Sequence, residues 1–233
     1  EMSRGLGDVY KRQEASRRQF SANVSHELRT PLTTISGYAE LLSSGMLQKP
    51  EDATEFGRKI LAESRRLLTL IEDIIRLSRL DEGVRGEVTP VDLTALIQHC
   101  VQKLTPAAQN AQVSISASGN DPVLISGDHA LLEEMLTNLL ENGIKYNHAG
   151  GYVRARAEMA DGRAVVTVAD NGVGIAPEDQ QRVFERFYRV DKSRSKQTGG
   201  TGLGLSIVKH GAQVHHAQIA MQSALCLLYT SPS

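Results

Sequence analysis

The sequence predicts two domains of different class, an α-helical hairpin followed by an α+β sandwich. Up to Leu80, apolar residues recur at helical spacing. A short polar linker follows, and beyond it short β-branched runs alternate with helical stretches. With 233 residues, the chain is long enough for two small domains or one large one.

The hairpin is expected from two amphipathic helices. The first covers residues 16–46 and the second residues 53–80, and Gly45 and Pro50 punctuate the connection between them. Each helix has one apolar stripe, and two helices alone make a thin core. Pairing two hairpins into a four-helix bundle covers both stripes, so we expect a homodimer. The stripes consist of Phe20, Val24, Leu28, Ile35 and Leu42 in the first helix and of Ile60, Leu67, Ile71 and Ile74 in the second, with Leu61, Leu68 and Ile75 beside the latter.

The second domain begins after a polar linker at residues 81–89. Two later runs alternate apolar and polar residues around Asp161-Gly162, a dipeptide favoured in tight β-hairpin turns. Helices grouped against a mixed sheet make an α+β sandwich. We expect strands at residues 113–118, 123–126, 152–160, 163–170 and 218–223, and helices at residues 129–142, 177–187 and 202–215.

Composition excludes several classes of function. The 26 Lys and Arg residues and 27 Asp and Glu residues leave a net charge of -1, which argues against bulk electrostatic binding of nucleic acid or of a membrane surface. Aromatic residues make up only 4% of the chain and Trp is absent, so no stacking platform for bases is expected. No apolar run approaches the roughly 20 residues of a membrane span, and Cys100 and Cys226 lack zinc-ligand spacing. We therefore expect a soluble chain in a reducing, cytoplasmic compartment.

His26 is the first candidate for chemistry, within the string FSANVSHELRTPL. It lies nearly opposite the apolar stripe on the helical wheel, and a lone histidine there is usually a solvated surface residue. Its neighbours favour a function. Glu27 can hold one ring nitrogen so that the other stays nucleophilic, Pro31 should bend or loosen the helix, and Thr30 places a hydroxyl on the same face, where it could orient a water.

Two asparagines four residues apart form the second candidate. Asn138 and Asn142 project from one helical face, where amide oxygens suit Mg²⁺, and Lys145 could meet a phosphate. Taken alone, either asparagine is as readily a helix cap or terminator.

Two glycine-rich strings complete the candidates. DNGVG at residues 170–174 follows a strand and offers a carboxylate for an exocyclic amine beside a backbone that a flat ring can approach, although such a string alone is commonly a turn. TGGTGLGL at residues 198–205 opens a helix as a phosphate cradle and is neither a dinucleotide fingerprint nor a P-loop. Between them, a basic segment with Lys192, Arg194 and Lys196 is either a solvated loop or a lid for a triphosphate.

In order and spacing, these strings strongly resemble the transmitter region of bacterial sensor histidine kinases, nearest to the phosphate-regulon group. The resemblance covers residues 15–223 and rests on an H box at His26, an N box at 138–146, a first glycine box at 170–175, a phenylalanine box at 184–189 and a second glycine box at 200–205.

The resemblance implies a domain organisation. Residues 14–82 are expected to form a dimerisation and histidine phosphotransfer domain and residues 91–223 a catalytic ATP-binding domain of the Bergerat type, joined by a linker at 83–90. Residues 1–13 show no helical or strand period, and residues 224–233 break off a strand pattern, so both are interpreted as non-native flanks.

The resemblance also implies roles for single residues, with ATP and Mg²⁺ as cofactors and the receiver domain of a response regulator as partner. His26 is expected to be the phosphoacceptor, Glu27 its acid/base partner, and Thr30 the residue that serves dephosphorylation of the regulator. The other roles are Asn142 as Mg²⁺ ligand with Asn138 beside it, Lys145 as phosphate contact, Tyr146 as adenine-side contact, Asp170 as acceptor for the adenine amino group, Gly172 and Gly174 as adenine-pocket lining, Gly200, Gly202 and Gly204 as phosphate flank, and Arg189 as the lid residue for the γ-phosphate.

The leading function is therefore an ATP-dependent protein-histidine kinase that passes its phosphoryl group to an aspartate, in a parent protein attached to the membrane through a part preceding this chain. An ATPase machine of the gyrase, Hsp90 or MutL type is the second hypothesis, and it is disfavoured because it needs a glutamate base where this chain has Asn138. A catalytically impaired dimerisation fragment is the third. It is kept because residues 224–233 replace the family's last strand, which leaves a sheet edge unpaired, and His215-His216 stand where the family has a Gly-Gly pair.

Overall fold

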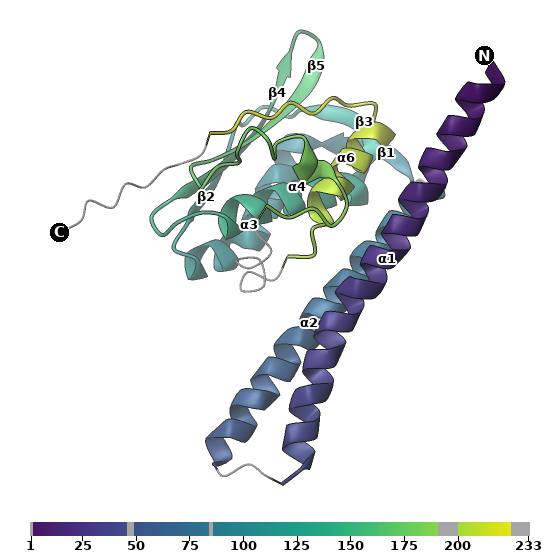
Figure 1. The fold of residues 1–233 in the computed structure, drawn as a ribbon. Helices are drawn as coiled ribbons and strands as arrows, with labels where there is room; N and C mark the ends of the chain where they lie inside the picture. The colour runs from purple at the N-terminus through teal and green to yellow at the C-terminus, as the bar shows by residue number, and fades with distance from the viewer. Residues whose placement is uncertain (1, 46–48, 84–85, 191–199, 225–233) are drawn as a thin grey trace. The chain divides into compact units, whose positions relative to one another are not determined.

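The computed structural model describes residues 2–45, 49–83, 86–190 and 200–224. The chain divides into two compact units (Figure 1): a hairpin unit that comprises the chain up to Ser78 together with the short segment Ser195–Thr201, and an α/β unit that comprises Arg79–Arg194 and the chain from Gly202 onward. Within the described ranges, no helix is long and apolar enough to cross a membrane.

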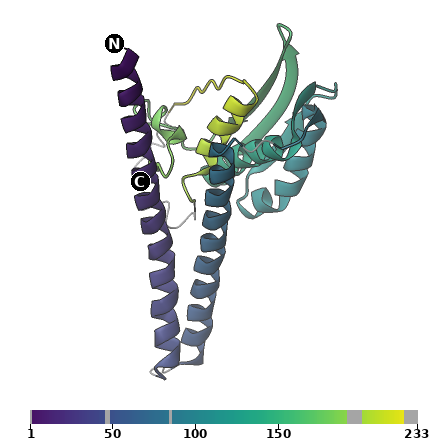
Figure 2. The ribbon, with the colours of Figure 1, turned by 90° about the vertical axis from the view of Figure 1, so that its right-hand side faces the viewer.

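Two long helices, α1 (Met2–Ser43) and α2 (Pro50–Asp81), form the hairpin (Figures 1 and 2), and both predicted helices are confirmed. After α1, Gly45 has a φ of 68°, a left-handed conformation that glycine adopts without steric cost. Pro50 is the first residue of α2, where its missing N–H is not needed. Met2–Gln13 lacks an apolar period but is helical, because extending a helix costs little once its nucleus exists.

The inward-facing row of α2 omits Ile71 from the predicted stripe and includes Glu63, Leu70 and Leu77, which the prediction did not. Leu70 and Leu77 are 4% and 1% exposed, whereas Ile71, placed in the stripe by the 3.6-residue period, is 38% exposed. The row instead follows alternating steps of three and four residues, the 3.5-residue spacing of packed helix pairs. It consists of Ile60, Glu63, Leu67, Leu70, Ile74 and Leu77.

In its described residues, the α/β unit has two small sheets. The first pairs β1 (Val88–Asp92) antiparallel with β3 (Leu124–Asp128). In the second, β4 (Tyr152–Ala160) lies between β2 (Ser114–Ser118), to which it is parallel, and β5 (Arg163–Asp170), to which it is antiparallel. The β4–β5 turn is the predicted one, and its two residues both have positive φ, as a type I′ turn requires.

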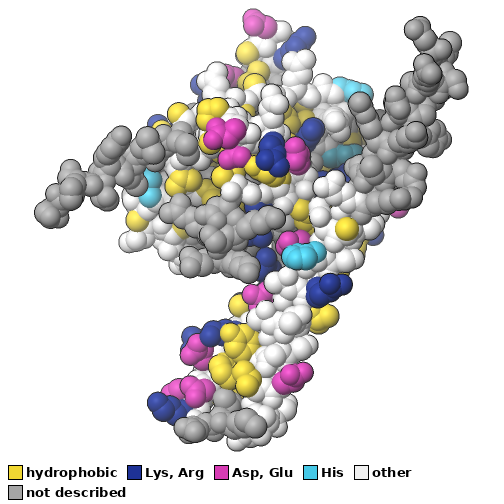
Figure 3. Space-filling view, viewed as in Figure 1, with side chains coloured by type: hydrophobic (Ala, Val, Ile, Leu, Met, Phe, Trp, Pro, Cys, Tyr) yellow, Lys and Arg dark blue, Asp and Glu magenta, His cyan; other side chains and the backbone are white. Residues whose placement is uncertain are grey.

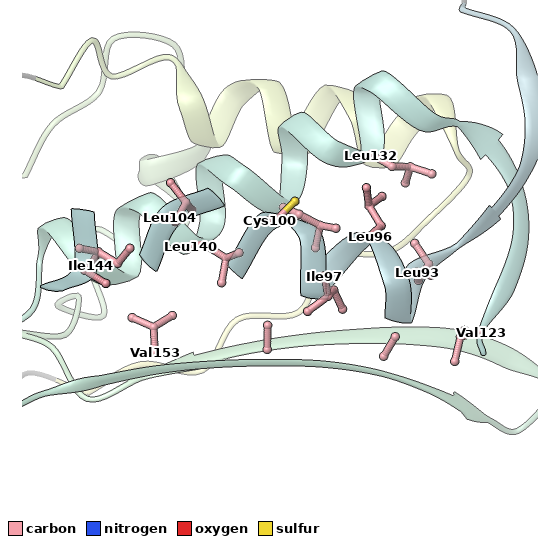
Figure 4. Packing of buried hydrophobic residues seen from close by; sticks show 14 of the residues in the cluster. Leu93, Leu96, Ile97, Cys100, Leu104, Val123, Leu132, Leu140, Ile144 and Val153 are labelled. Carbon is pink, nitrogen blue, oxygen red and sulfur yellow. The ribbon is translucent and has the colours of Figure 1, made fainter. Parts of the chain in front are cut away.

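Three helices accompany these sheets: α3 (Leu93–Asn110), α4 (His129–Lys145) and α6 (Gly204–Val214). Figure 4 shows the apolar side chains of α3 and α4 packed over the sheet. Leu140 on α4 and Val153 on β4 have no exposed surface. The mixed sheet covered by helices confirms the predicted α+β class.

The structure adds β1 and α3, which the sequence interpretation did not include. β1 overlaps the predicted linker at residues 83–90, so that linker is shorter than expected. α3 begins at an N-cap that was overlooked: Asp92 Oδ1 accepts hydrogen bonds from the backbone N–H groups of Thr94 (3.0 Å) and Ala95 (3.4 Å).

Two predicted elements are wrong. Residues 177–187 form turns and one 3₁₀ turn, η1 (Arg182–Phe184), instead of a helix. Phe187 has a φ of 63° and its N–H donates to the Gly202 carbonyl (2.9 Å), a tertiary bond incompatible with a helical continuation. Residues 218–223 form no strand, because Ser223 at their end makes its hydrogen bonds with loop residues instead of a neighbouring strand. Its Oγ accepts from Ile175 N (2.9 Å), and its carbonyl accepts from Gln180 Nε2 (2.8 Å). Apart from Ala224, the proposed replacement for the last strand lies outside the described residues.

We predict that Leu140→Ala destabilises the α/β unit by about 2–5 kcal/mol, because it leaves a cavity in a fully packed site. Leu124→Ala is the matched control, since Leu124 is 66% exposed and its truncation should change stability by less than about 0.5 kcal/mol. Chemical denaturation followed by circular dichroism measures both, and equal stabilities would contradict the described core.

Candidate functional site

His26 stands on the outer face of α1. Its side chain is 77% exposed, and Nδ1 lies 3.8 Å from Glu27 Oε1. This distance is too long for a hydrogen bond, but it places the carboxylate next to one ring nitrogen. The opposite nitrogen, Nε2, is left for an incoming group. The two side chains are neighbours, and the hold of Glu27 on the ring stays a prediction.

Thr30 and Pro31 occupy the next turn of α1. Thr30 Oγ1 donates to the His26 carbonyl at 3.2 Å, so its proton is engaged by its own helix while its lone pairs can still accept. Pro31 is fully buried, and α1 continues past it to Ser43. The predicted loosening therefore does not interrupt the helix, because flanking turns keep their hydrogen bonds.

The remaining predicted residues gather in the α/β unit, where the end of α4 carries the two asparagines. Asn138 Nδ2 donates to the Glu134 carbonyl (3.1 Å), which directs its Oδ1 away from the helix axis. That oxygen lies against Gly204, where an added Cβ would come within 2.5 Å of it. Asn142, one turn later, is half-buried, as is Lys145.

Tyr146 follows α4 and lies near two positive side chains, Lys145 and Arg189. Lys145 Nζ is 5.2 Å from the centre of its ring. Burial raises the pKa of the Tyr146 hydroxyl, and the positive charge of Arg189 partly offsets this rise. Arg189 is distant in sequence, so the fold brings it to the end of α4, with its Nε and Nη2 atoms buried.

The turn after β5 packs directly against Tyr146. Asp170 Oδ1 accepts from Gly172 N (2.8 Å), and Val173 N donates to the Tyr146 carbonyl (3.0 Å). A Cβ at Gly172 would collide with that same carbonyl oxygen. Gly174 has a φ of 72°, which makes the bend that completes the turn. Asp170 itself is exposed, and its Oδ2 can accept from a ligand.

Two asparagines that sequence reasoning missed support this turn. Asn147 Nδ2 donates to the carbonyls of Gly143 (3.1 Å) and Tyr152 (3.0 Å), and Asn171 Oδ1 accepts from Tyr152 N (2.6 Å). Asn147 joins the end of α4 to the start of β4, and Asn171 joins the turn after β5 to the start of β4. For Asn147 the sequence signal was its place just past a helix, where asparagine is a common terminator.

The second glycine string lies beside the phenylalanine string. Gly202 has a φ of 74° and accepts the Phe187 N–H, and any Cβ there would approach the Phe187 Cα at 3.0 Å. Gly204 begins α6, and the first N–H groups of a helix have no acceptor within the helix itself, which makes a helix start suited to an anion. Gly200 lies in the irregular stretch before it. The predicted basic lid residues Lys192, Arg194 and Lys196 lie outside the described residues.

The candidate site is therefore built in two parts. The hairpin unit carries an exposed imidazole with a carboxylate and a hydroxyl nearby. The α/β unit brings together Asn138, Asn142, Tyr146, Asp170, Arg189 and the turns at Gly172, Gly174 and Gly202. Along the chain, these residues are separated by up to two strands and a loop.

Two protein families match these parts in the same order. Residues 16–83 match the His Kinase A (phospho-acceptor) domain, and residues 127–226 match the family of histidine kinase-, DNA gyrase B- and HSP90-like ATPases. This chain belongs to the sensor histidine kinases.

Relatives of this kinase chain share both units. It is 43% identical over 213 residues to the sensor-like histidine kinase SenX3 of Mycolicibacterium smegmatis, covering 91% of this chain and 55% of that protein. It is 38% identical over 218 residues to the phosphate regulon sensor protein PhoR of Pseudomonas aeruginosa, covering 90% of this chain and 48% of that protein. The kinase chain thus spans about half the length of the curated relatives it matches.

A solved structure agrees with the fold. Full-length ShkA in complex with AMPPNP superposes with a TM-score of 0.60 and 31% identity, covering 83% of this chain and 40% of that chain. The α/β unit of the kinase chain is accordingly an ATP-binding unit by family.

We predict that Gly172→Ala weakens ATP binding by about tenfold, because the added Cβ displaces either the Tyr146 carbonyl or the turn that carries Asp170, at a cost of about 1–3 kcal/mol. Calorimetric titration with ATP measures this. Gly150→Ala is the control: Gly150 also turns the chain, with a φ of 81°, but nothing lies within 4 Å of its added Cβ. Unchanged affinity in Gly172→Ala would contradict the packing described for this turn.

Proposed function

We propose that this chain is the transmitter of a sensor kinase, which phosphorylates His26 with ATP and passes the phosphoryl group to an aspartate of a response regulator. The observation that carries the proposal is the exposed His26 imidazole with Glu27 beside Nδ1, in a chain whose other unit is of an ATP-binding family. Exposure alone is also typical of a solvated surface histidine, so the proposal depends on the neighbouring carboxylate and on the two matching families as well.

The chemistry follows from the two ring nitrogens. His26 Nε2 attacks the γ-phosphorus of ATP in line, the bond from that phosphorus to the bridging oxygen breaks, and ADP leaves with the electron pair. The ring must then lose the proton on Nδ1, and Glu27 Oε1 is the nearest described acceptor at 3.8 Å. Glu27 thus acts as the acid/base partner of the imidazole.

The nucleotide roles are proposed from the family resemblance, and the arrangement of the α/β unit supports them. Asp170 accepts a hydrogen bond from the adenine amino group, and the ring enters over Gly172 and Gly174 beside Tyr146. Lys145 and Arg189 offset phosphate charge, with Gly200, Gly202 and Gly204 allowing close approach of the backbone. ShkA, whose solved structure contains AMPPNP, supports a nucleotide at the corresponding unit.

Mg²⁺ fits the same surface. Asn142 would hold it, with Asn138 beside it, because amide oxygens are hard ligands and the bond from Asn138 Nδ2 to the Glu134 carbonyl leaves Oδ1 as the free acceptor of that amide. When bound, the ion neutralises charge on the phosphates.

A homodimer is proposed from the outer face of the hairpin. Leu61, Leu68 and Ile75 follow each other at seven-residue steps and are 50%, 60% and 49% exposed, with Ile71 between them. Figure 3 shows hydrophobic side chains gathered on the hairpin. A second hairpin would bury this stripe in a four-helix bundle. The regulator's receiver domain would dock near His26, and consumption of ATP places the reaction in the cytoplasm.

We predict that His26→Ala abolishes incorporation of acid-labile, base-stable label from γ-labelled Mg²⁺-ATP, because the nucleophile is lost. ATP affinity should stay within about twofold of the parent, since no nucleotide contact is proposed for His26. Asn142→Ala is the matched variant, and it should lose Mg²⁺-ATP affinity instead. Label retained in His26→Ala would refute the proposal, and ATP hydrolysis without any label in the parent would favour the ATPase hypothesis.

We predict that Thr30→Ala lowers dephosphorylation of the regulator by about 10²-fold, because its oxygen can accept from the attacking water. Autophosphorylation should stay near the parent rate, since no step of that reaction uses the hydroxyl. Both rates are measured on one purified variant. A parallel fall would assign Thr30 to the shape of the helix, through its bond to the His26 carbonyl.

A further inference from the structure

Three charged side chains form a partly buried group in the seam between α1 and α2. Arg66 on α2 is 15% exposed, and Glu27 on α1 and Glu63 on α2 are each 26% exposed. Arg66 Nη2 lies 3.9 Å from Glu27 Oε2, and Arg66 Nη1 lies 3.8 Å from Glu63 Oε2. One guanidinium therefore links carboxylates of both helices, and we call these three residues the seam ion group.

Glu63 holds an unusual place in this group. It is the one charged residue in the buried row of α2 from Ile60 to Leu77, within the part of the chain that is described. Its Oε2 is buried and makes no hydrogen bond with the described residues, and the Arg66 guanidinium supplies a positive charge 3.8 Å away. Partial burial of such an ion group is weak evidence for stability, because desolvation of the charges offsets much of their attraction.

The two oxygens of Glu27 face different partners. Oε1 is 3.8 Å from His26 Nδ1, and Oε2 is 3.9 Å from Arg66 Nη2. A carboxylate is planar, so attraction of one oxygen to a fixed cation limits the directions that the other can take. Arg66 is more buried than Glu27 and comes from the facing helix, so it is the more constrained member of the pair.

We propose that Arg66 is a positioning residue for phosphorylation of His26. It holds Glu27 by Oε2 so that Oε1 faces Nδ1, and Glu63 in turn holds Arg66 from α2. This inference rests on the proposed kinase function. Arg66 exchanges no proton or phosphoryl group: Nε2 forms the bond to phosphorus, ADP departs, and the Nδ1 proton passes to Glu27.

The first test compares initial autophosphorylation rates of Arg66→Gln, Arg66→Lys and Arg65→Gln at varied ATP. Arg66→Gln should lower kcat by about 10²-fold, the scale expected for a misplaced reacting group, with KM for ATP unchanged. Arg66→Lys restores a positive charge and should recover much of kcat. Arg65 is the matched control because it is an exposed arginine on the adjacent position, and its change should leave both parameters within about twofold of the parent.

The second test separates positioning from a purely structural role. If Arg66 acts through Glu27, adding Arg66→Gln to Glu27→Gln should lower kcat less than twofold further. Losses that multiply in the double variant would overturn the inference, as would a parent-like kcat in Arg66→Gln. Thermal unfolding checks that each variant is folded. Where Arg66→Gln unfolds the hairpin, Glu27→Gln is added to the folded Arg66→Lys variant instead. A kcat that does not fall on this addition also overturns the inference.

These outcomes distinguish the inference from the function on which it rests. A parent chain without His26-dependent label refutes the proposed function itself. A labelled parent with an unaffected Arg66→Gln variant refutes only the role of Arg66.

Discussion

The α/β unit depends on the close packing of the end of α4 against the turn after β5. The Tyr146 carbonyl accepts Val173 N–H, and there is no room for a side chain at Gly172 between them. Below this contact, Gly143 lies against Val153, where an added Cβ would approach both methyl groups at 3.0 Å. The nearby core residue Leu140 has no exposed surface. The position of Asp170 relative to α4 therefore follows from the packing of small residues over a rigid core.

The hairpin obeys a different constraint. Its seam is an apolar row at seven-residue spacing that includes one member of the seam ion group, Glu63, and another member, Glu27, follows the proposed phosphoacceptor His26 directly in sequence. The imidazole is exposed because it faces away from that row, whereas Glu27 and Arg66 are partly withdrawn from water. The proposed reactive residues and the packing residues thus lie in the same stretch of α1 and α2. A substitution in the seam is expected to affect phosphorylation of His26 through Glu27 without altering the α/β unit.

Sequence patterns were most reliable where the signal was local. The Asp161-Gly162 turn and the flanking strands agree with the structure residue for residue, because both turn positions need the positive φ that these residue types tolerate. The predictions failed where tertiary bonds decided. Residues 177–187 looked helical, but Phe187 is held in a left-handed conformation by its bond to Gly202, which comes from a loop later in the chain.

The candidate site shows the same division. His26, Glu27, Asn138, Asn142 and Asp170 could be named from the sequence because their chemistry depends on residue type and on spacing within one element. The roles of Asn147, Asn171 and Arg66 could not, because each acts on a group from another element. The sequence by itself determined the two fold classes, the hairpin turn and the motif residues, since these depend on short-range periodicity and backbone preference. Only the tertiary structure decided which side chain faces which oxygen, because such contacts depend on how separate helices and strands pack.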